Sequence, residues 1–323
     1  MVRELSRREL ISHAGVCWGA AALATLAENS LSPSLAAEPD QRSGAEPFGY
    51  SLNTGTLRGQ KLPLNALVDV ASKAGYQAIE PWVEEIRRYA ESGGSLADLK
   101  KQAQDRGIRV VDAIGFADWI SDDDDKRQAG LEQMRREMEL VAQIGGIRIA
   151  APPSGAYNTA VDLRKVAERY RKVLELGRSL GIVAQLELWG GAKTLSRLGE
   201  IAFVTVEADD PDACALLDAF HLYKGGNDFA GLRMLNGGTM HVFHINDYPA
   251  DPPREKVTDA HRVYPGDGSA PLSLILKTLH STGFRGFLSL ELFNRDYWQQ
   301  DPLEVARTGL AKVRAAVAEA LAS

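Results

Sequence analysis

The stretch Phe284–Asn294, FRGFLSLELFN, has the pattern of a buried β-strand bounded by glycine turn signals. Side chains alternate between the two faces of a strand, so the leucines face one side and Ser289, Glu291 and Phe293 face the other. An unpaired buried carboxylate is costly. Glu291 should therefore have a strong partner, such as a cation, a metal ion or a substrate.

The composition is that of a globular protein with ample apolar material for a core. The chain has 323 residues, 45% hydrophobic and 25% charged, which allows one large domain or two small ones. The formal net charge of −6 disfavours a nucleic-acid surface, which is normally basic. We therefore expect no nucleic-acid partner.

Residues 1–37 have the pattern of a twin-arginine export signal. Arg7 and Arg8 lie in the segment SRRELI, an Ala-rich apolar run covers 14–27, and small residues at 34–37 offer a cleavage site. An amphipathic helix and a retained membrane anchor are the alternatives. Residues 38–47 are polar and predict a linker, and 48–323 form the predicted catalytic domain. No later stretch is long and apolar enough to span a bilayer, so we expect a periplasmic or otherwise exported protein without stable membrane insertion.

The cysteines agree with export. Cys17 lies in the signal, so cleavage leaves Cys214 alone and no intramolecular disulfide can form. Its neighbours are apolar, which predicts a buried structural thiol. Twin-arginine export carries folded proteins, which suits a protein that binds its cofactor before leaving the cytoplasm.

After the linker, short apolar segments alternate with helical patterns. The predicted strands are Phe48–Leu52, Ala78–Pro81, Arg109–Ile114, Ile147–Ala151, Val183–Leu188, Ala213–Asp218, His241–Asn246 and Gly286–Leu292. This alternation predicts an α/β protein with a (β/α)₈ TIM barrel. A doubly wound open sheet is the runner-up, but no G-x-G-x-x-G motif follows the first strand.

Apolar residues at helical spacing support the barrel. The stripes begin at Leu64, Leu131, Val166 and Leu303, and the last has Asp301 as its N-cap and Pro302 at its first helical position. Ile201–Glu207 is rich in β-branched residues, but we assign it to a helix because Ala213–Leu217 is the better-placed sixth strand.

Acidic and imidazole side chains lie where four successive predicted strands end. They are Glu187, Asp218, His244 and Glu291. The carboxyl ends of barrel strands converge on one site. Three carboxylates and one imidazole favour Mn²⁺, Mg²⁺ or Co²⁺ over a thiolate-type zinc site. A lone strand-end acid is often a cap or salt-bridge partner, but four on consecutive strands predict metal binding.

Other polar and aromatic residues should surround this site. His221 lies just past the sixth strand, where it is placed to hydrogen-bond a substrate hydroxyl or to serve only as a loop residue. His241 and His244 point to opposite faces of one strand, so we interpret His241 as structural. Trp82, Trp189 and Phe293 each lie two residues beyond a strand-end Glu and could stack on a substrate or simply pack.

Several of these residues lie in motifs that resemble those of a known family. The chain from about 48 to 320 resembles the xylose isomerase-like TIM-barrel family of sugar isomerases and epimerases, which includes ketose 3-epimerases and inosose dehydratases. The marks of the resemblance are Glu80 in AIEP, Glu187 in LE, Asp218-x-x-His221, His244 with Asp247, Pro265–Gly268 (PGDG) and Leu290–Glu291. They are specific for the superfamily but not for a substrate.

The resemblance implies roles for particular residues. Carried over from the ketose 3-epimerases, Glu187, Asp218, His244 and Glu291 would bind one divalent ion, and Glu187 and Glu291 would also transfer protons. The substrate-binding set would be His221, Arg262, Glu80, Trp189 and Asp247. Many relatives have Lys where Asn246 stands, which weakens any transfer of an inosose substrate. Dimers or tetramers are usual in that family, so a homo-oligomer is an option.

The predicted chemistry is proton abstraction next to a carbonyl through a metal-stabilised enediolate, as in a sugar isomerase or epimerase. The alternative is a lyase or hydratase acting on a keto-sugar such as a 3-keto-glycoside or an inosose, since both reactions need the same ion and base. A non-catalytic sugar-binding barrel would not need both Glu187 and Glu291. An endonuclease IV-like nuclease needs a His-rich three-zinc cluster, and only five histidines lie beyond the signal.

We predict that replacing both Arg7 and Arg8 with Lys traps the precursor in the cytoplasm, because the paired arginines precede the apolar run. Fractionation of cells producing the wild-type and double-mutant chains measures this. Unchanged delivery of the mature double mutant to the periplasm would contradict the prediction.

Overall fold

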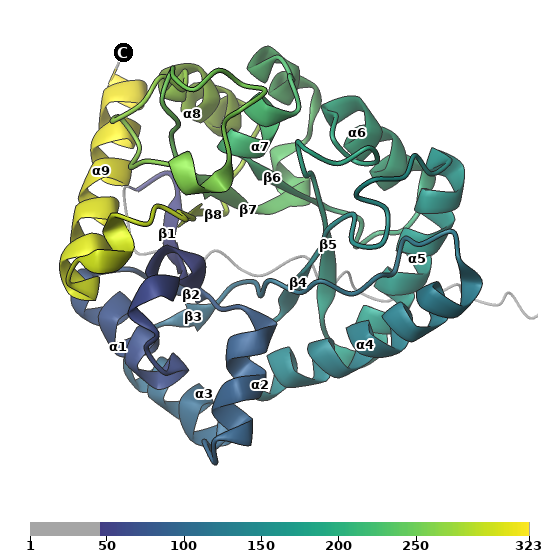
Figure 1. The fold of residues 1–323 in the computed structure, drawn as a ribbon, viewed down its shortest axis with the longest axis horizontal. Helices are drawn as coiled ribbons and strands as arrows, with labels where there is room; N and C mark the ends of the chain where they lie inside the picture. Colours follow the sequence, from purple (N-terminus) through teal and green to yellow (C-terminus); the bar gives the residue numbers. More distant parts are fainter. Residues whose placement is uncertain (1–45, 323) are drawn as a thin grey trace, which may run out of the picture. The chain divides into compact units, whose positions relative to one another are not determined.

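The computed structural model describes residues 46–322. The predicted export signal at 1–37 and most of the predicted linker at 38–47 lie outside these residues. Figure 1 shows the described domain with its strands at the centre and its helices around them. None of the described helices is both long and apolar enough to cross a membrane.

The sheet confirms the predicted (β/α)₈ class. Its parallel strands are β1 (Gly49–Asn53), β2 (Ala78–Glu80), β3 (Arg109–Val110), β4 (Arg148–Ala151), β5 (Val183–Glu187), β6 (Ala215–Asp218), β7 (Met240–Ile245) and β8 (Phe287–Leu290). They pair in the order β3-β2-β1-β8-β7-β6-β5-β4. At the seam between the two ends of this order, β4 meets the segment that follows β3, where the Ala150 amide donates to the Ala113 carbonyl at 2.9 Å.

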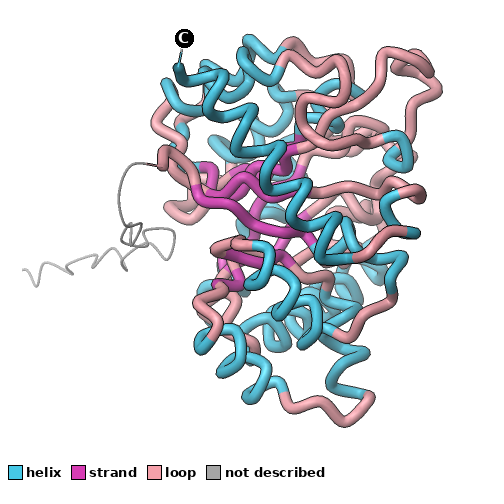
Figure 2. Tube along the Cα trace, turned by 90° about the vertical axis from the view of Figure 1, so that its left-hand side faces the viewer, coloured by secondary structure: helices cyan, strands magenta, loops and turns pink. Residues whose placement is uncertain are grey.

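The helices flank this sheet in both views (Figures 1 and 2). They are α1 (Leu64–Ala74), α2 (Val83–Glu91), α3 (Leu96–Asp105), α4 (Asp124–Gln143), α5 (Leu163–Leu180), α6 (Leu198–Glu207), α7 (Ala219–Lys224), α8 (Leu272–Ser281) and α9 (Pro302–Ala322). Short 3₁₀ helices are η1 (Thr54–Gln60), η2 (Phe229–Met234), η3 (Gly237–Thr239), η4 (Asp259–His261) and η5 (Tyr297–Gln299). The assignment of Ile201–Glu207 to a helix is confirmed.

The predicted boundaries hold least well at the third strand. We predicted Arg109–Ile114, but the regular ladder ends at Val110. Beyond it the chain keeps only separate contacts, such as the Val111 amide to the Ile79 carbonyl at 3.2 Å and a bridge between Ile114 and Trp82. The chain thus leaves the ladder early at the seam of the barrel.

The helix ends follow the predicted capping chemistry. The Asp301 carboxylate accepts from the amides of Leu303 and Glu304, and α9 begins at Pro302. Gly75 and Gly181 end α1 and α5 with φ of 95° and 72°, which glycine adopts without strain. Cys214 is a buried free thiol, as predicted.

The two faces of β8 divide as the alternation predicted. Leu290 points to α9, where a Cβ on Gly309 would come within 2.2 Å of its Cδ2 atom. The absence of a side chain at Gly309 therefore lets α9 approach β8 closely. On the opposite face Ser289 donates to the Glu80 carboxylate at 2.7 Å inside the barrel. This packing fixes the direction in which the next residue on that face, Glu291, points.

Candidate active site

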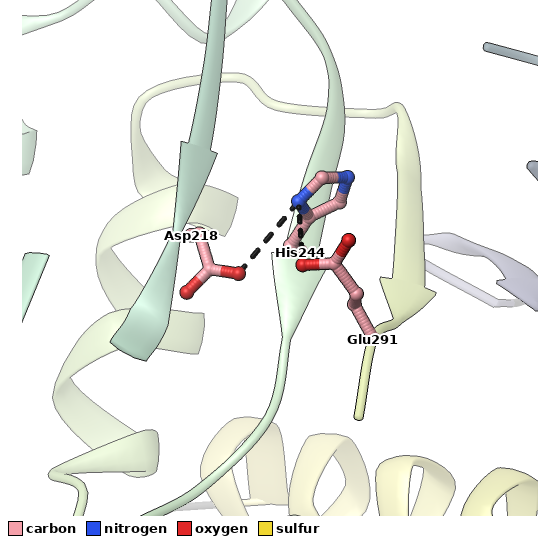
Figure 3. Close-up of side chains that lie close together, drawn as sticks. All are labelled: Asp218, His244 and Glu291. Atoms are coloured by element: carbon pink, nitrogen blue, oxygen red, sulfur yellow. Dashed lines mark ion pairs between the residues drawn. The ribbon is translucent and has the colours of Figure 1, made fainter. Parts of the chain in front are cut away.

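Three predicted site residues converge where β6, β7 and β8 end (Figure 3). Ligand atoms of Asp218, His244 and Glu291 all lie within 4.8 Å of one another. The His244 Nδ1 atom is 3.4 Å from Glu291 Oε2 and 3.6 Å from Asp218 Oδ2. Ladder register explains the convergence, since Asp218 pairs with His244 between neighbouring parallel strands. We call these residues the trio.

A carboxylate holds the imidazole of His244 on the side of the ring away from the trio. Its Nε2 atom lies 2.9 Å from Glu80 Oε1. The other oxygen of Glu80 accepts from Asn53 Nδ2 at 2.8 Å and from Ser289 Oγ at 2.7 Å. The Nδ1 atom is buried without a hydrogen-bond partner and faces the other two members of the trio. A carboxylate on one ring nitrogen orients the other toward an ion in many metal sites.

Arg262 supplies a positive charge at the same place. This fully buried side chain follows η4, and its Nη1 atom is 2.7 Å from both Asp218 Oδ2 and Glu291 Oε2. Its Nη2 atom donates to Asp259 Oδ1 at 2.6 Å. The guanidinium also lines the cavity above the trio. The trio is therefore a site that already holds a cation on two of its oxygens.

The donor set of the trio fits a divalent ion. Carboxylate oxygens and an unpaired imidazole nitrogen suit Mn²⁺, Mg²⁺, Co²⁺ or Zn²⁺. Asp218 and His244 are fully buried, and Glu291 is nearly so, so an ion there would be shielded from water. The Arg262 guanidinium has to leave Asp218 Oδ2 and Glu291 Oε2 before an ion can bind these atoms.

Glu187, the fourth predicted ligand, ends β5 and lines the same cavity but lies outside the trio. Its Oε2 atom is buried without a hydrogen bond. Burial raises the pKa of Glu187 to about 8, and the charge of Glu291 adds to the rise while His244 opposes it. Burial likewise raises the pKa of Glu291 to about 7, against the opposing charges of His244 and Arg262. Both carboxylates are thus stronger bases than exposed ones.

His221 lies at the start of α7 beside this cluster. Its backbone amide donates to Asp218 Oδ1 at 2.8 Å, so Asp218 also serves as the N-cap of α7. Burial lowers the pKa of His221 to about 4, so the ring is neutral near pH 7. Its Nε2 atom lies 3.3 Å from Arg262 Nη2, and the ring lines the cavity. A neutral imidazole there can exchange hydrogen bonds with a substrate hydroxyl.

A cavity of 570 Å³ opens at the carboxyl ends of the strands. Of the predicted site residues, its lining includes Glu187, Glu291, His221, Arg262 and Trp189. The structure thus brings these side chains together around one cavity. Asp218 and His244 lie beneath this lining, where Arg262 covers the Asp218 carboxylate.

Two predicted substrate contacts are placed elsewhere. Glu80 does not line the cavity, because its carboxylate is fully buried under His244 and holds that ring. Asp247 accepts from the backbone amides of Gly266, Gly268 and Ala270, so it anchors the loop after η4. In both cases the local donors satisfy the carboxylate, and we correct the prediction from substrate binding to positioning.

His241 behaves as predicted. It lies at the opposite end of β7 from the trio, with Arg148 and Asp212 as its charged neighbours, and it is not part of the trio. Burial lowers the pKa of His241 to about 3. The ring is therefore neutral and structural.

Sequence reasoning missed some residues around the cavity. Asn53 bridges Glu80 and Glu291, and its position as the first polar residue after the first strand was a usable signal. Asp259 pairs with Arg262 from the short 3₁₀ helix η4, which no periodic pattern marks. Phe116 and Tyr157 line the cavity from loops after β3 and β4, and no motif marks them.

Comparisons with known proteins show which proteins this chain resembles. The family model described as a xylose isomerase-like TIM barrel matches residues 68–316. The chain is 24% identical over 257 residues to an inosose isomerase of Bacillus velezensis, covering 78% of this chain and 91% of the relative. It is 25% identical over 251 residues to a 3-dehydroshikimate dehydratase of Pseudomonas putida, covering 75% of this chain and 38% of that protein. The solved structure of the IolI protein with a binding zinc atom has a TM-score of 0.78 at 21% identity, covering 85% of this chain and 100% of that one.

We predict that His244→Gln weakens binding of Mn²⁺ by at least about tenfold, because it removes the only nitrogen of the trio. Calorimetric titration of chelator-treated protein measures this affinity. His241→Gln is the matched control, since it changes a partly buried imidazole on the same strand outside the trio. Equal Mn²⁺ affinities for the two variants would contradict the assignment of the trio.

We also predict that Arg262→Gln lowers the stability of the metal-free protein by about 3–5 kcal/mol, because it leaves two buried carboxylates without their cation. Added Mn²⁺ should restore stability and raise the melting temperature more than in the wild type, where the ion must displace the guanidinium.

Urea and thermal unfolding with and without Mn²⁺ measure both effects. Arg88→Gln removes an exposed pair with Glu84 and serves as the control, with an expected change within about 0.5 kcal/mol. An Arg262→Gln protein that responds to Mn²⁺ no more than the wild type would show that the ion and the guanidinium do not share oxygens.

Proposed function

The chain belongs to the xylose isomerase-like TIM-barrel family, and on that premise we propose that it is a divalent-metal-dependent isomerase or epimerase of a keto-sugar. The observation that carries the proposal is the unpaired His244 Nδ1 atom facing two buried carboxylates, beneath a cavity that Glu187 and Glu291 line. A relative named as an inosose isomerase and a similar structure that contains zinc support it.

The proposed residue roles follow from position. Asp218, His244 and Glu291 would hold the ion, with Glu187 reaching it from β5 across the same cavity. When bound, the ion would supply Lewis-acid stabilisation of the charge that develops on the substrate oxygens during proton loss. His221 and Arg262 would orient these oxygens from the wall of the cavity.

Glu187 and Glu291 are the proposed proton carriers. They end β5 and β8, two strands that are not neighbours in the sheet, so they can approach a sugar carbon from different sides. Transfer of a proton from one face by one carboxylate and its return by the other inverts the configuration of that carbon. A carboxylate whose pKa burial raises toward neutrality, as at Glu187, is well matched to this task near pH 7.

A lyase acting on a keto-sugar is the second candidate. The relative named as a 3-dehydroshikimate dehydratase favours it. The same base would remove the same α-proton, and a leaving group at the β carbon would depart in place of reprotonation. The two candidates differ in their products, because elimination gives an unsaturated ketone that absorbs in the ultraviolet. The proposed export signal would place either activity in the periplasm.

We predict metal-dependent incorporation of deuterium at a carbon next to the carbonyl when the loaded protein is incubated with keto-sugars in D₂O. Glu187→Gln and Glu291→Gln should each lower the exchange rate by about 10²-fold or more. Nuclear magnetic resonance follows the exchange and absorbance follows elimination.

Glu137→Gln is the matched control for these variants. Glu137 is also a buried carboxyl whose pKa burial raises, but it lies on α4 outside the cavity. Its variant should keep the wild-type exchange rate. A broad screen that shows neither exchange nor elimination with the metal fully bound would favour a sugar-binding protein over both enzymes.

A further inference from the structure

Aromatic side chains form a continuous row along one side of the cavity. In spatial order the row is Tyr157, Trp189, Phe116, Trp82 and Phe293, and all of them line the cavity. Consecutive ring centroids are 6.1, 5.9, 5.0 and 5.9 Å apart, within the range of direct aromatic contact. We call this row the aromatic belt. Its residues come from the loops after β4, β5, β3, β2 and β8.

The belt keeps large apolar surface open to solvent. Phe116 is 39% exposed and Tyr157 is 46% exposed, which makes them the only exposed large aromatic side chains among residues 46–322. Neighbouring exposed rings that line a cavity are typical of a binding surface, because their burial by a ligand is favourable. The Arg58 guanidinium lies 3.7 Å from the Trp82 ring centroid and supports this end of the belt.

The belt offers ring faces and few hydrogen bonds. Phe116 and Phe293 have no polar atoms. The indole nitrogen of Trp82 already donates to Asn53 Oδ1 at 3.1 Å. Such a surface suits an apolar, planar group better than a second sugar ring, whose hydroxyl groups would need partners.

The polar groups over the trio meet the belt at one end, where the Arg262 guanidinium carbon lies 5.1 Å from the Phe293 ring centroid. His221, Asp259 and Arg262 are joined to one another and to the trio. Lys224 is held by the backbone carbonyls of residues 254, 255 and 257. The cavity thus has a polar half over the trio, suited to a sugar, and an aromatic half with different chemistry.

The size of the cavity requires more than one sugar ring to fill it. Its volume of 570 Å³ lies within the range of about 300–1,000 Å³ that holds drug-sized ligands. Four successive centroid spacings of 5.0–6.1 Å make the belt longer than one pyranose ring. A monosaccharide at the trio would leave much of the belt uncovered.

We propose that the substrate is a keto-sugar glycoside that carries an aromatic group, with the sugar over the trio and the aromatic group on the belt. This inference rests on the proposed function for the sugar half of the site. The aromatic half selects the substrate by stacking, and it takes no part in proton transfer.

Binding of inert probes tests the selection without any reaction. Phenyl and methyl glucopyranosides, each as the α and β anomer, and cellobiose are titrated into the Mn²⁺-loaded protein by calorimetry. We expect at least one phenyl anomer to bind about tenfold more tightly than its methyl counterpart and than cellobiose. Equal affinities, tighter binding of cellobiose, or no binding of either phenyl anomer would overturn the proposal.

Variants locate the effect on the belt. Phe116→Ala and Tyr157→Ala should each remove most of the phenyl-to-methyl ratio while leaving the methyl affinity and the melting temperature unchanged, since both rings are partly exposed. Met234→Ala is the matched control, because Met234 is 80% exposed and lies outside the cavity lining. A ratio that survives both aromatic substitutions would also overturn the proposal.

The reaction is tested separately with phenyl and methyl 3-keto-glucosides. The proposal predicts that the phenyl glucoside has the higher kcat/KM for exchange or elimination, and that this difference comes from a lower KM. Turnover of both at equal kcat/KM would retain the proposed function and overturn the aromatic selection. Turnover of neither, together with a broad keto-sugar screen that shows no exchange or elimination, would overturn the proposed function, and an intact phenyl preference in binding would then support the belt as an aryl-glycoside site.

Discussion

The buried charge of Arg262 is the interaction on which the rest of the site depends. Asp218 and Glu291 are carboxylates inside the barrel end, and both bind one guanidinium nitrogen at 2.7 Å. His244 compensates Glu80 in the same way: burial alone would lower the pKa of His244, but Glu80 and Glu291 hold it well above its usual value. Burial and the nearby charge of Glu80 raise the pKa of Asp112 well above its usual value. Since unpaired buried charges are strongly destabilising, the cations and carboxylates fix one another's positions.

This balance of charge also connects strands that are distant in the sequence. Asn53 at the end of β1 donates to both Glu80 and Glu291, and thus joins β1, β2 and β8. Asn246 after β7 donates to Asp218 at 3.0 Å and accepts from the Phe220 amide at 3.0 Å, which joins β7, β6 and α7. Each amide satisfies groups on two elements at once. The polar network therefore sets the relative positions of the strand ends, while the apolar layer behind them supplies the burial.

The sequence predicted the site residues that lie on periodic strands, and it left out those that lie on segments without periodicity. Glu291 could be placed because strand alternation puts it on the face opposite the leucines, and successive strand ends brought in Asp218, His244 and Glu187. Glu80 and Asp247 also follow strands, but the pattern cannot tell an acid that faces a cavity from one that neighbouring donors satisfy. Asp259, the partner of Arg262, lies on a single turn of 3₁₀ helix, and the rings of Phe116 and Tyr157 lie on loops. The conformation of such segments follows from tertiary packing and not from a repeating pattern.

Arg262 links the two interpretations of the site that the sequence and the structure give. The family resemblance assigns it to substrate oxygens, whereas the structure places it on the two oxygens that a divalent ion would need. The guanidinium cannot bind the substrate oxygens and the two carboxylates at the same time, but it can bind them in turn. The guanidinium lines the cavity and is held on its other side by Asp259, three residues earlier at the start of η4. An ion that takes over Asp218 and Glu291 would free one edge of the guanidinium for the cavity. Substrate orientation by Arg262 would then require a bound ion, since without it the same hydrogen bonds are satisfied by the trio.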